Sequence, residues 1–322
     1  MKFKKILDIF PTPKFLDISF SGLSISDSTI HCIKFGKKNR GLFIEKHAEK
    51  NIPIGVINSG QINNKEELTS ILSSLKKDLD LSFVRASLPE EKAYLFTMKI
   101  PVVKQSEVKA AIESKIEENV PVSVSELIFD YKLVDYSKKG YLSAIVSALP
   151  ISIIDTYVDV ANNAGLELLS LEIESQSIAR ALLPKGNLDT VLIVNFGKEK
   201  VGLYVVNNRI VHFTSTVVLK GESLNNPASL SQEIKRLYIY WHTLKENAGV
   251  PERKINKIIV CGEDLKETFI PYISAHNQSP VILGNVWENV FDIDNIVPEI
   301  SFSDSLRYAT AIGLALPSDV LI

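Results

Sequence analysis

The sequence predicts an α/β protein of two related halves, the first of which carries an inserted α+β unit. The order strand, strand, strand, helix, strand occurs twice, starting near Phe15 and again near Thr190. A chain of 322 residues has the length of about two ordinary domains. Recurrence of one order of elements at this spacing indicates a duplicated fold.

The composition is that of a globular protein and argues against several functional classes. The 36 basic and 38 acidic residues give a formal net charge of -2, whereas general nucleic-acid binders carry a basic excess, so we expect no nucleic-acid partner. Cys32 and Cys261 form no CxxC pattern, which excludes a disulfide scaffold. No uncharged stretch reaches the roughly 20 residues of a membrane-spanning helix. We therefore expect a cytoplasmic protein.

Residues 1–14 form a basic amphipathic segment in front of the first half. Its apolar residues fall on one side of a helical pattern: Phe3, Ile6, Leu7 and Phe10. Pro11 and Pro13 would end any helix there. Two interpretations stay open, a weak anchor on a membrane surface and a terminus whose apolar side chains dock on the protein.

The first core unit is expected over residues 15–90. Alternation of apolar and polar residues, together with flanking turn residues, predicts four strands. These strands are expected at 15–20, 23–35, 41–49 and 82–88. Leucines and isoleucines spaced by three and four predict a helix at 66–79, and Pro89 marks the end of the unit.

The inserted α+β unit is expected over residues 91–165, and residues 166–185 return to the first core as a strand and a helix. In the insertion the patterns predict strands at 92–100, 127–134 and 141–148 and helices at 106–119 and 151–164. The return strand is expected at 166–173 and its helix at 175–183, which ends at Pro184.

The second core half is expected over residues 186–322. The patterns predict strands at 190–196, 201–206, 209–219, 257–260 and 280–283, and helices at 232–247, 265–275 and 305–316. Asn207 and Asn208 are expected to form the tight turn between the second and third strands. The final helix is rich in small residues.

Two strand hairpins that face each other across a cleft can hold a phosphate chain. Backbone N–H groups of the turns bind anions, and a carboxylate at a strand end can hold Mg²⁺. In the first half we assign this role to the hairpin at 16–23, with Asp17 as the metal-binding carboxylate. Ser19, Ser21 and Gly22 would follow as phosphate-binding turn residues.

The second half offers the matching positions. Asn195 stands where the second carboxylate would stand, and Gly197 and Lys198 follow in the turn. Gly262 and Glu263 come after the strand at 257–260, where a glycine turn would let a base and ribose lie on the backbone. An alternative is that Asp17 and Asn195 merely cap strand ends.

The sequence lacks the motifs of several other enzyme classes. The five histidines make no HExxH pattern, and the chain has no GxSxG or GxxxxGK[ST] pattern. Hydrolase, zinc-protease and P-loop functions are therefore not supported.

Three stretches resemble the PilM family of type IV pilus assembly proteins, relatives of the division protein FtsA. They are the proline-bearing stretch 120–131, the helix–strand–helix segment 149–183 and the closing helix 307–315. The resemblance extends over about residues 15–316. It implies an actin-like, ribonuclease H-like fold of two lobes with an inserted subdomain, and Mg-ATP as the cofactor to be tested.

The chain departs from the family pattern in all three nucleotide motifs. Ser19 stands where the family has a glycine, Asn195 replaces an acid, and only Gly262 remains of a glycine pair. Glu263 would repel a phosphate at close range. We therefore expect degenerate nucleotide binding and no catalysis. An active actin-like ATPase or small-molecule kinase, and an FtsA-like filament protein, remain as alternatives.

The resemblance implies a partner rather than a substrate. PilM-like proteins hold the N-terminal cytoplasmic tail of the inner-membrane protein PilN in a groove between the first core and the insertion. Here that implies a groove beside the strands 82–88 and 166–173, with Arg85 and Glu172 as candidate contacts. The expected function is a cytoplasmic scaffold of the pilus assembly complex, peripherally associated with the inner membrane. The sequence does not tell whether the system builds pili, a secretion machine or a DNA-uptake apparatus.

Overall fold

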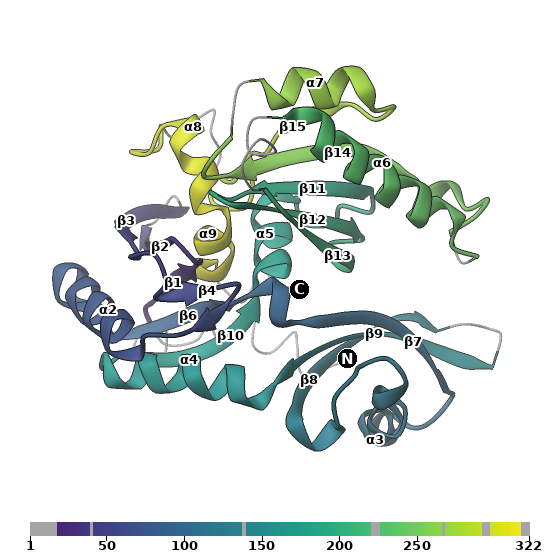
Figure 1. Cartoon of the computed structure of the whole chain (residues 1–322), viewed down its shortest axis with the longest axis horizontal. Coiled ribbons are helices and arrows are strands. Elements are labelled where there is room, and N and C mark those ends of the chain that lie inside the picture. Colours follow the sequence, from purple (N-terminus) through teal and green to yellow (C-terminus); the bar gives the residue numbers. More distant parts are fainter. Residues whose placement is uncertain are drawn as a thin grey trace.

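Two five-stranded sheets of the same topology form the core of this computed structural model, which describes residues 18–38, 41–136, 140–219, 226–245, 247–265, 268–291 and 297–316 (Figure 1). The first sheet has the order β10-β6-β1-β2-β3 and the second the order β13-β12-β11-β14-β15. In each sheet three antiparallel strands are extended by two parallel ones. This repeated arrangement confirms that the fold is duplicated.

The strands follow the alternation in the sequence closely. The first sheet consists of β1 (Phe20–Ile25), β2 (Thr29–Lys38), β3 (Gly41–Asn51), β6 (Phe83–Leu88) and β10 (Glu167–Ile173). The second consists of β11 (Thr190–Phe196), β12 (Lys200–Asn207), β13 (Ile210–Val218), β14 (Ile255–Gly262) and β15 (Val281–Leu283). A short hairpin, β4 (Ile57–Asn58) with β5 (Gln61–Ile62), precedes the first long helix.

The insertion is a three-stranded antiparallel sheet of order β7-β9-β8 with a short helix on one face. Its elements are β7 (Tyr94–Pro101), α3 (Val108–Glu113), β8 (Leu127–Tyr136) and β9 (Tyr141–Pro150). The helix expected at 106–119 is regular only over Val108–Glu113, and a separate 3-10 turn follows at Ile116–Glu118. Ile112 and Ile116 still pack in the core of the insertion.

The outer helices cover the sheets from outside (Figure 1). On the first sheet these are α2 (Lys65–Leu79) and α4 (Ile151–Asn163), which pack against each other. On the second they are α6 (Pro227–Thr243) and α7 (Phe269–His276). The prediction assigned α4 to the insertion, but its buried face joins the hydrophobic core of the first sheet.

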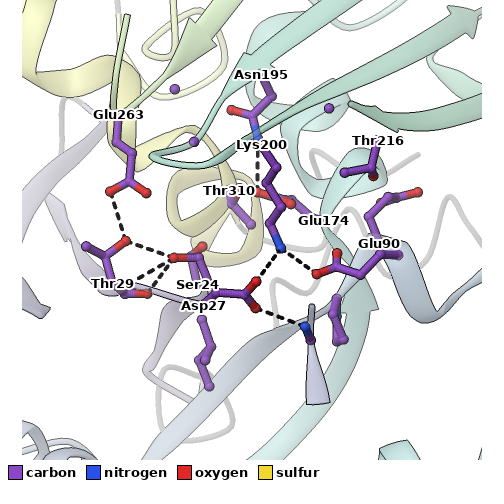
Figure 2. Close-up of a pocket in the computed structure, with 18 of the residues that line it drawn as sticks. Ser24, Asp27, Thr29, Glu90, Glu174, Asn195, Lys200, Thr216, Glu263 and Thr310 are labelled. Carbon is purple, nitrogen blue, oxygen red and sulfur yellow. Dashed lines mark hydrogen bonds and ion pairs between the residues drawn. The ribbon is translucent and has the colours of Figure 1, made fainter. Parts of the chain in front are cut away.

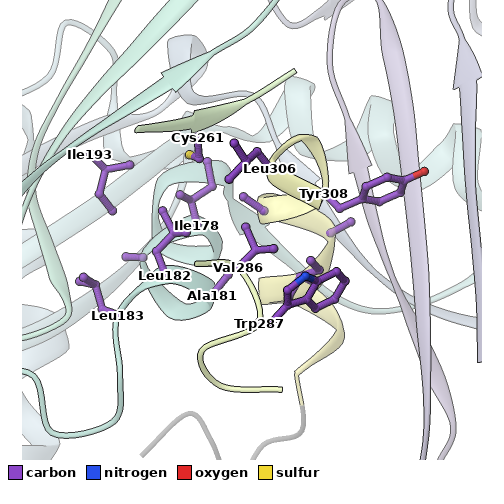
Figure 3. Packing of buried hydrophobic residues seen from close by; sticks show 14 of the residues in the cluster. Ile178, Ala181, Leu182, Leu183, Ile193, Cys261, Val286, Trp287, Leu306 and Tyr308 are labelled. Atoms are coloured by element: carbon purple, nitrogen blue, oxygen red, sulfur yellow. The ribbon is translucent and has the colours of Figure 1, made fainter. Parts of the chain in front are cut away.

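Two helices cross between the lobes. Helix α5 (Glu174–Leu182), from the end of the first half, packs on β12 and β13 of the second sheet. Helix α9 (Ala309–Ala315), which follows α8 (Phe302–Ser305) in the second half, packs on β1, β2 and β6 of the first. Figure 3 shows Ile178 and Leu182 of α5 close to Ile193 of β11 and Cys261 of β14. One apolar core therefore extends through both lobes.

The first hairpin lies further along the chain than predicted. We expected strands at 15–20 and 23–35 with a turn at Ser21 and Gly22, but β1 runs through both residues and pairs Gly22 with Ile33. The turn is at 26–28, where Ser26 N–H donates to Thr29 O at 2.9 Å. Gly22 is required by packing instead, because a Cβ there would clash with the backbone of Ala311 in α9.

Two further boundaries differ. The turn between β12 and β13 is formed by Asn208 and Arg209, one residue later than expected. Helix α6 starts at Pro227 and not at residue 232, because the Asn226 side chain accepts from Ala228 N–H and Pro227 suits the first helical position.

Candidate functional site: an interlobe cleft and an adjacent groove

A narrow polar cleft separates the two lobes where β1 and β11 end. Its walls come from the β1–β2 turn, the 3-10 turn Glu90–Lys92, the start of α5 and the β11–β12 turn. Its free volume is about 60 Å³. Pockets for drug-sized ligands measure about 300–1,000 Å³. Protein side chains therefore fill most of this cleft.

Lys200 occupies the centre of the cleft. Its ammonium pairs with Asp27 of the first lobe at 3.2 Å and, still closer, with Glu91. Figure 2 shows the side chain reaching from the second lobe down to Asp27. Burial alone would lower the Lys200 pKa, but the charges of Glu91 and Asp27 raise it overall. One cation therefore joins the two lobes through ion pairs.

Asp27 is fixed by backbone groups of the first lobe. Its two carboxylate oxygens accept the N–H groups of Ser59 and Gly60, at 3.0 and 2.9 Å. The Gly60 carbonyl in turn accepts from the buried Tyr157 hydroxyl at 3.2 Å. The carboxylate is thus held in place on one side and faces Lys200 on the other.

Glu174 joins the first turn of α5 to the second lobe. One of its carboxylate oxygens accepts from Asn195 Nδ2 at 3.0 Å and from Thr310 Oγ1 at 3.2 Å. Burial raises the Glu174 pKa above its usual value. Asn195 therefore pairs with a protein carboxylate, and its side-chain oxygen lies 3.5 Å from Cys261 Sγ.

Glu90 is fully buried beside this cluster. Its oxygens accept from the Ser175 N–H at 2.9 Å and the Ser175 hydroxyl at 3.0 Å. Burial raises the Glu90 pKa to about 7, although the hydrogen bonds from Ser175 favour the charged form. This carboxyl changes its protonation near neutral pH.

The turn that follows β14 contacts the first lobe across the cleft. Glu263 accepts from Thr29 Oγ1 at 2.9 Å (Figure 2). Gly262 has φ +114°, and a Cβ at this position would clash with the backbone of Phe196. The glycine therefore serves the packing of the turn onto β11.

Some of the predicted site residues lie in the cleft and others do not. Asn195, Gly197, Gly262 and Glu263 line it, as the pattern of the second half predicts. Others are elsewhere: Ser19 precedes β1, Ser21 and Gly22 lie within β1 away from the cleft lining, exposed Lys198 bonds to Asn51, and Asp17 lies outside the described residues. The misplaced first hairpin accounts for these differences.

Sequence reasoning missed four groups that dominate the cleft: Asp27, Glu90, Glu174 and Lys200. The polar run Ser26-Asp27-Ser28 lies between two alternating stretches, a pattern that predicts a turn and would have placed Asp27 in it. Glu90 and Glu174 come shortly after the ends of β6 and β10, and Lys200 is the first residue of β12. No distinctive local pattern marks any of the three.

An open groove of about 870 Å³ lies on the other side of the same wall. It is bounded by β8 of the insertion, β10 of the first sheet, α5 and the β12–β13 turn. Consecutive residues 128–132 of β8 and 170–173 of β10 line it, so the strands present their edges. Within the described residues neither outer edge is paired with another strand.

Apolar side chains form much of the groove floor and walls: Leu88, Leu95, Ile128, Leu149, Leu171 and Ile173. Of the two predicted partner contacts, Glu172 lines the groove and pairs with Arg180. Arg85 lies in β6, outside the groove lining, with its guanidinium over the Phe20 ring and its Nη1 donating to Leu316 O at 3.4 Å.

The described residues contain no group of three or more His, Cys, Asp or Glu placed to hold a metal ion. None of their helices has the length and apolar character needed to cross a membrane.

Comparison with known proteins gives a family and a fold. Residues 22–249 match the family model described as type IV pilus assembly protein PilM. The solved PilM-PilN type IV pilus biogenesis complex superposes with a TM-score of 0.79 at 15% identity, covering 92% of this chain and 98% of that chain. A search of curated proteins finds no match.

A second solved structure is similar over most of its length. The cytoplasmic domain of EpsL, an inner-membrane component of the type II secretion system of Vibrio cholerae, gives a TM-score of 0.50 at 11% identity. It covers 84% of this chain and 92% of that chain. Together with the duplicated topology, these likenesses confirm the predicted actin-like two-lobe fold with an inserted subdomain.

Proposed function

The chain belongs to the PilM family of type IV pilus assembly proteins, and we propose that it is a non-catalytic scaffold. In this role it captures the N-terminal cytoplasmic tail of a PilN-like inner-membrane protein. The protein would thereby be held at the inner membrane within the pilus assembly complex. The complex of PilM with PilN that superposes on this chain supports the choice of partner.

The observation that carries the proposal is the groove between two unpaired strand edges. An extended peptide can add to such an edge through backbone hydrogen bonds, while alternate side chains enter pockets. The groove offers the edges of β8 and β10 together with apolar side chains such as Ile128 and Leu171. Its volume of about 870 Å³ accommodates several residues of an extended chain.

The cleft supports the absence of catalysis. A triphosphate with Mg²⁺ needs space and a positive environment, whereas this cleft leaves about 60 Å³ and is lined by five carboxyl groups. The single positive charge of Lys200 is already shared between two of them, Asp27 and Glu91. Asn195 is engaged with Glu174. We infer that the lobes close on their own ion pairs and that Mg-ATP binds weakly or not at all.

The test of partner binding is calorimetric titration of the whole protein with the N-terminal cytoplasmic tail peptide of a PilN-like inner-membrane protein from the same organism. We expect a one-to-one complex with a dissociation constant in the micromolar range or below. Absence of binding at several hundred micromolar peptide would refute the scaffold proposal. A scrambled peptide of the same composition is the control.

The test of the cleft is a thermal melt with and without Mg-ATP. A ligand that binds only the folded state raises the melting temperature, so we expect no rise at millimolar Mg-ATP. A rise of several degrees that the Glu174→Gln variant abolishes would favour the alternative of an active actin-like ATPase.

A further inference from the structure

Arg209 adopts a backbone conformation that is unfavourable for its residue type at the edge of the groove. It follows Asn208 in the two-residue turn between β12 and β13, and both residues have positive φ, +52° for Asn208 and +61° for Arg209. Glycine is strongly preferred at the second position of such a turn, because a side chain there is strained. Both residues line the groove. Retained strain beside a binding surface suggests that the side chain has a role there.

The Arg209 guanidinium has no anionic partner of its own. It is half-buried, and its Nη2 donates to the Arg180 carbonyl at 3.4 Å. Within the described part of the chain, Arg209 forms no ion pair with a carboxylate. Burial and the nearby charge of Arg180 both lower the pKa of Arg209. A partly desolvated cation next to another cation is a site that an anion stabilises.

The surroundings leave positive charge in excess at this end of the groove. Arg180 is buried and pairs with Glu172, while its Nη1 donates to Gly313 O at 2.8 Å. The charge of Glu172 also acts on the guanidinium of Arg85. The carboxylate of Glu172 is therefore already shared between two guanidinium groups, those of Arg180 and Arg85.

The backbone around Arg209 is held in place. The Gln176 side chain on α5 donates to the Arg209 carbonyl at 3.2 Å, which ties the turn to the helix below the groove. An arginine on a fixed turn is well suited to bidentate binding of a carboxylate, because its planar guanidinium loses little freedom on binding.

We propose that Arg209 binds the carboxylate of an aspartate or glutamate in the captured tail, and so fixes where the tail lies along the groove. This inference rests on the proposed function, since it concerns a residue of the tail. Arg180 supports the site because its ion pair engages Glu172, the acidic groove residue on the neighbouring strand β10.

The experiment measures tail affinity by calorimetry for the whole protein and three variants. The probe is the N-terminal tail peptide of the PilN-like membrane protein from the same organism, together with peptides in which each Asp or Glu is changed to Asn or Gln. We expect Arg209→Gly to bind the tail about tenfold more weakly. Its melting temperature should not fall, because glycine suits φ +61°.

Asn208→Gly is the matched control. It relieves the same kind of strain in the same turn without removing a charge. Because Asn208 also lines the groove, we expect some loss of affinity, but clearly less than for Arg209→Gly. One neutralised peptide should lose affinity for the wild type but not for Arg209→Gly. Arg209→Glu should reject the natural tail and recover binding to a peptide in which that acidic residue is lysine.

The outcomes separate the two proposals. If the wild type does not bind the tail at all, the proposed function fails. If the wild type binds while Arg209→Gly and every neutralised peptide retain full affinity, the scaffold stands and the role of Arg209 is refuted. A loss of affinity in Arg209→Gly that Asn208→Gly shares in full would assign the effect to the turn backbone, and this also refutes the carboxylate contact.

Discussion

The interlobe cleft and the groove share a wall but are filled in opposite ways. Leu88 lines both, and helix α5 presents Glu174 to the cleft and Gln176 and Arg180 to the groove. In the cleft the protein satisfies its own polar groups across the lobes. In the groove, within the described residues, two strand edges are unpaired and Arg209 forms no ion pair with a carboxylate.

This difference supports the proposal that the groove, and not the cleft, takes the ligand. Buried polar groups are stable only when they are paired, and the cleft pairs its charges internally through Lys200, Asn195 and Thr29. An open strand edge with apolar neighbours is, in contrast, a template for an added strand. On the proposed function, the same fold closes its small-molecule site and keeps a peptide site open.

The largest effect is expected when the groove is blocked, which tests whether the groove binds the tail. Ile128 on β8 is 49% exposed and lines the groove, so Ile128→Glu adds a charge there without removing a core residue. We expect the affinity for the tail peptide to fall about 30- to 100-fold with an unchanged melting temperature. Ile239→Glu, at a 65% exposed position on α6 outside the groove lining, is the control and should bind normally. Equal affinities of the two variants would contradict the assignment of the groove.

A second test uses the pH dependence of the folding stability that Glu90, in the cleft, confers. Glu90 has a folded-state pKa of about 7, above the usual 4.5, so the folded state binds more protons than the unfolded state between these values. Stability therefore falls as pH rises from about 5 to 7, by an amount on the order of 2 kcal/mol. Gln at position 90 can keep the Ser175 contacts without titrating.

The measurement is chemical denaturation of the wild type and Glu90→Gln at pH 5 and pH 7. The difference between the two proteins isolates Glu90 from other groups, such as His31, whose pKa burial lowers to about 4 and whose effect has the opposite sign. Tail affinity should change little over the same range. A stability difference that does not vary with pH would show that Glu90 stays charged.

The smallest expected effect concerns the ion pairs between the lobes. Lys200→Met leaves Asp27 and Glu91 facing each other without a cation, but all three side chains are partly solvated. We expect a loss of about 1–2 kcal/mol, seen as a melting temperature lower by a few degrees. Lys198→Met is the matched control, since exposed Lys198 forms a hydrogen bond with Asn51 and, within the described residues, no ion pair with a carboxylate, so we expect a smaller loss. Equal melting temperatures would mean that Lys200 does not hold the lobes together.

Prediction from sequence succeeded where one strand or helix carries its own pattern. The strand at 190–196 was predicted with its observed bounds, and the end of α2 at Leu79 was also correct. The first hairpin failed because Gly22 looks like a turn residue, while its glycine is needed where α9 packs on β1. Helix α6 was placed too late, although Asn226 and Pro227 mark its start.

The sequence by itself determined the duplicated order of elements, the cleft positions of the second half such as Asn195 and Gly262, and the expected insertion. Only the tertiary structure decided that Lys200 pairs with Asp27, which is 173 residues away, and that Arg209 faces a groove formed by another lobe. The physical reason is that alternation and spacing encode which face of an element is apolar. The contacts between lobes depend on how α5 and α9 cross between the sheets, and no local pattern records that arrangement.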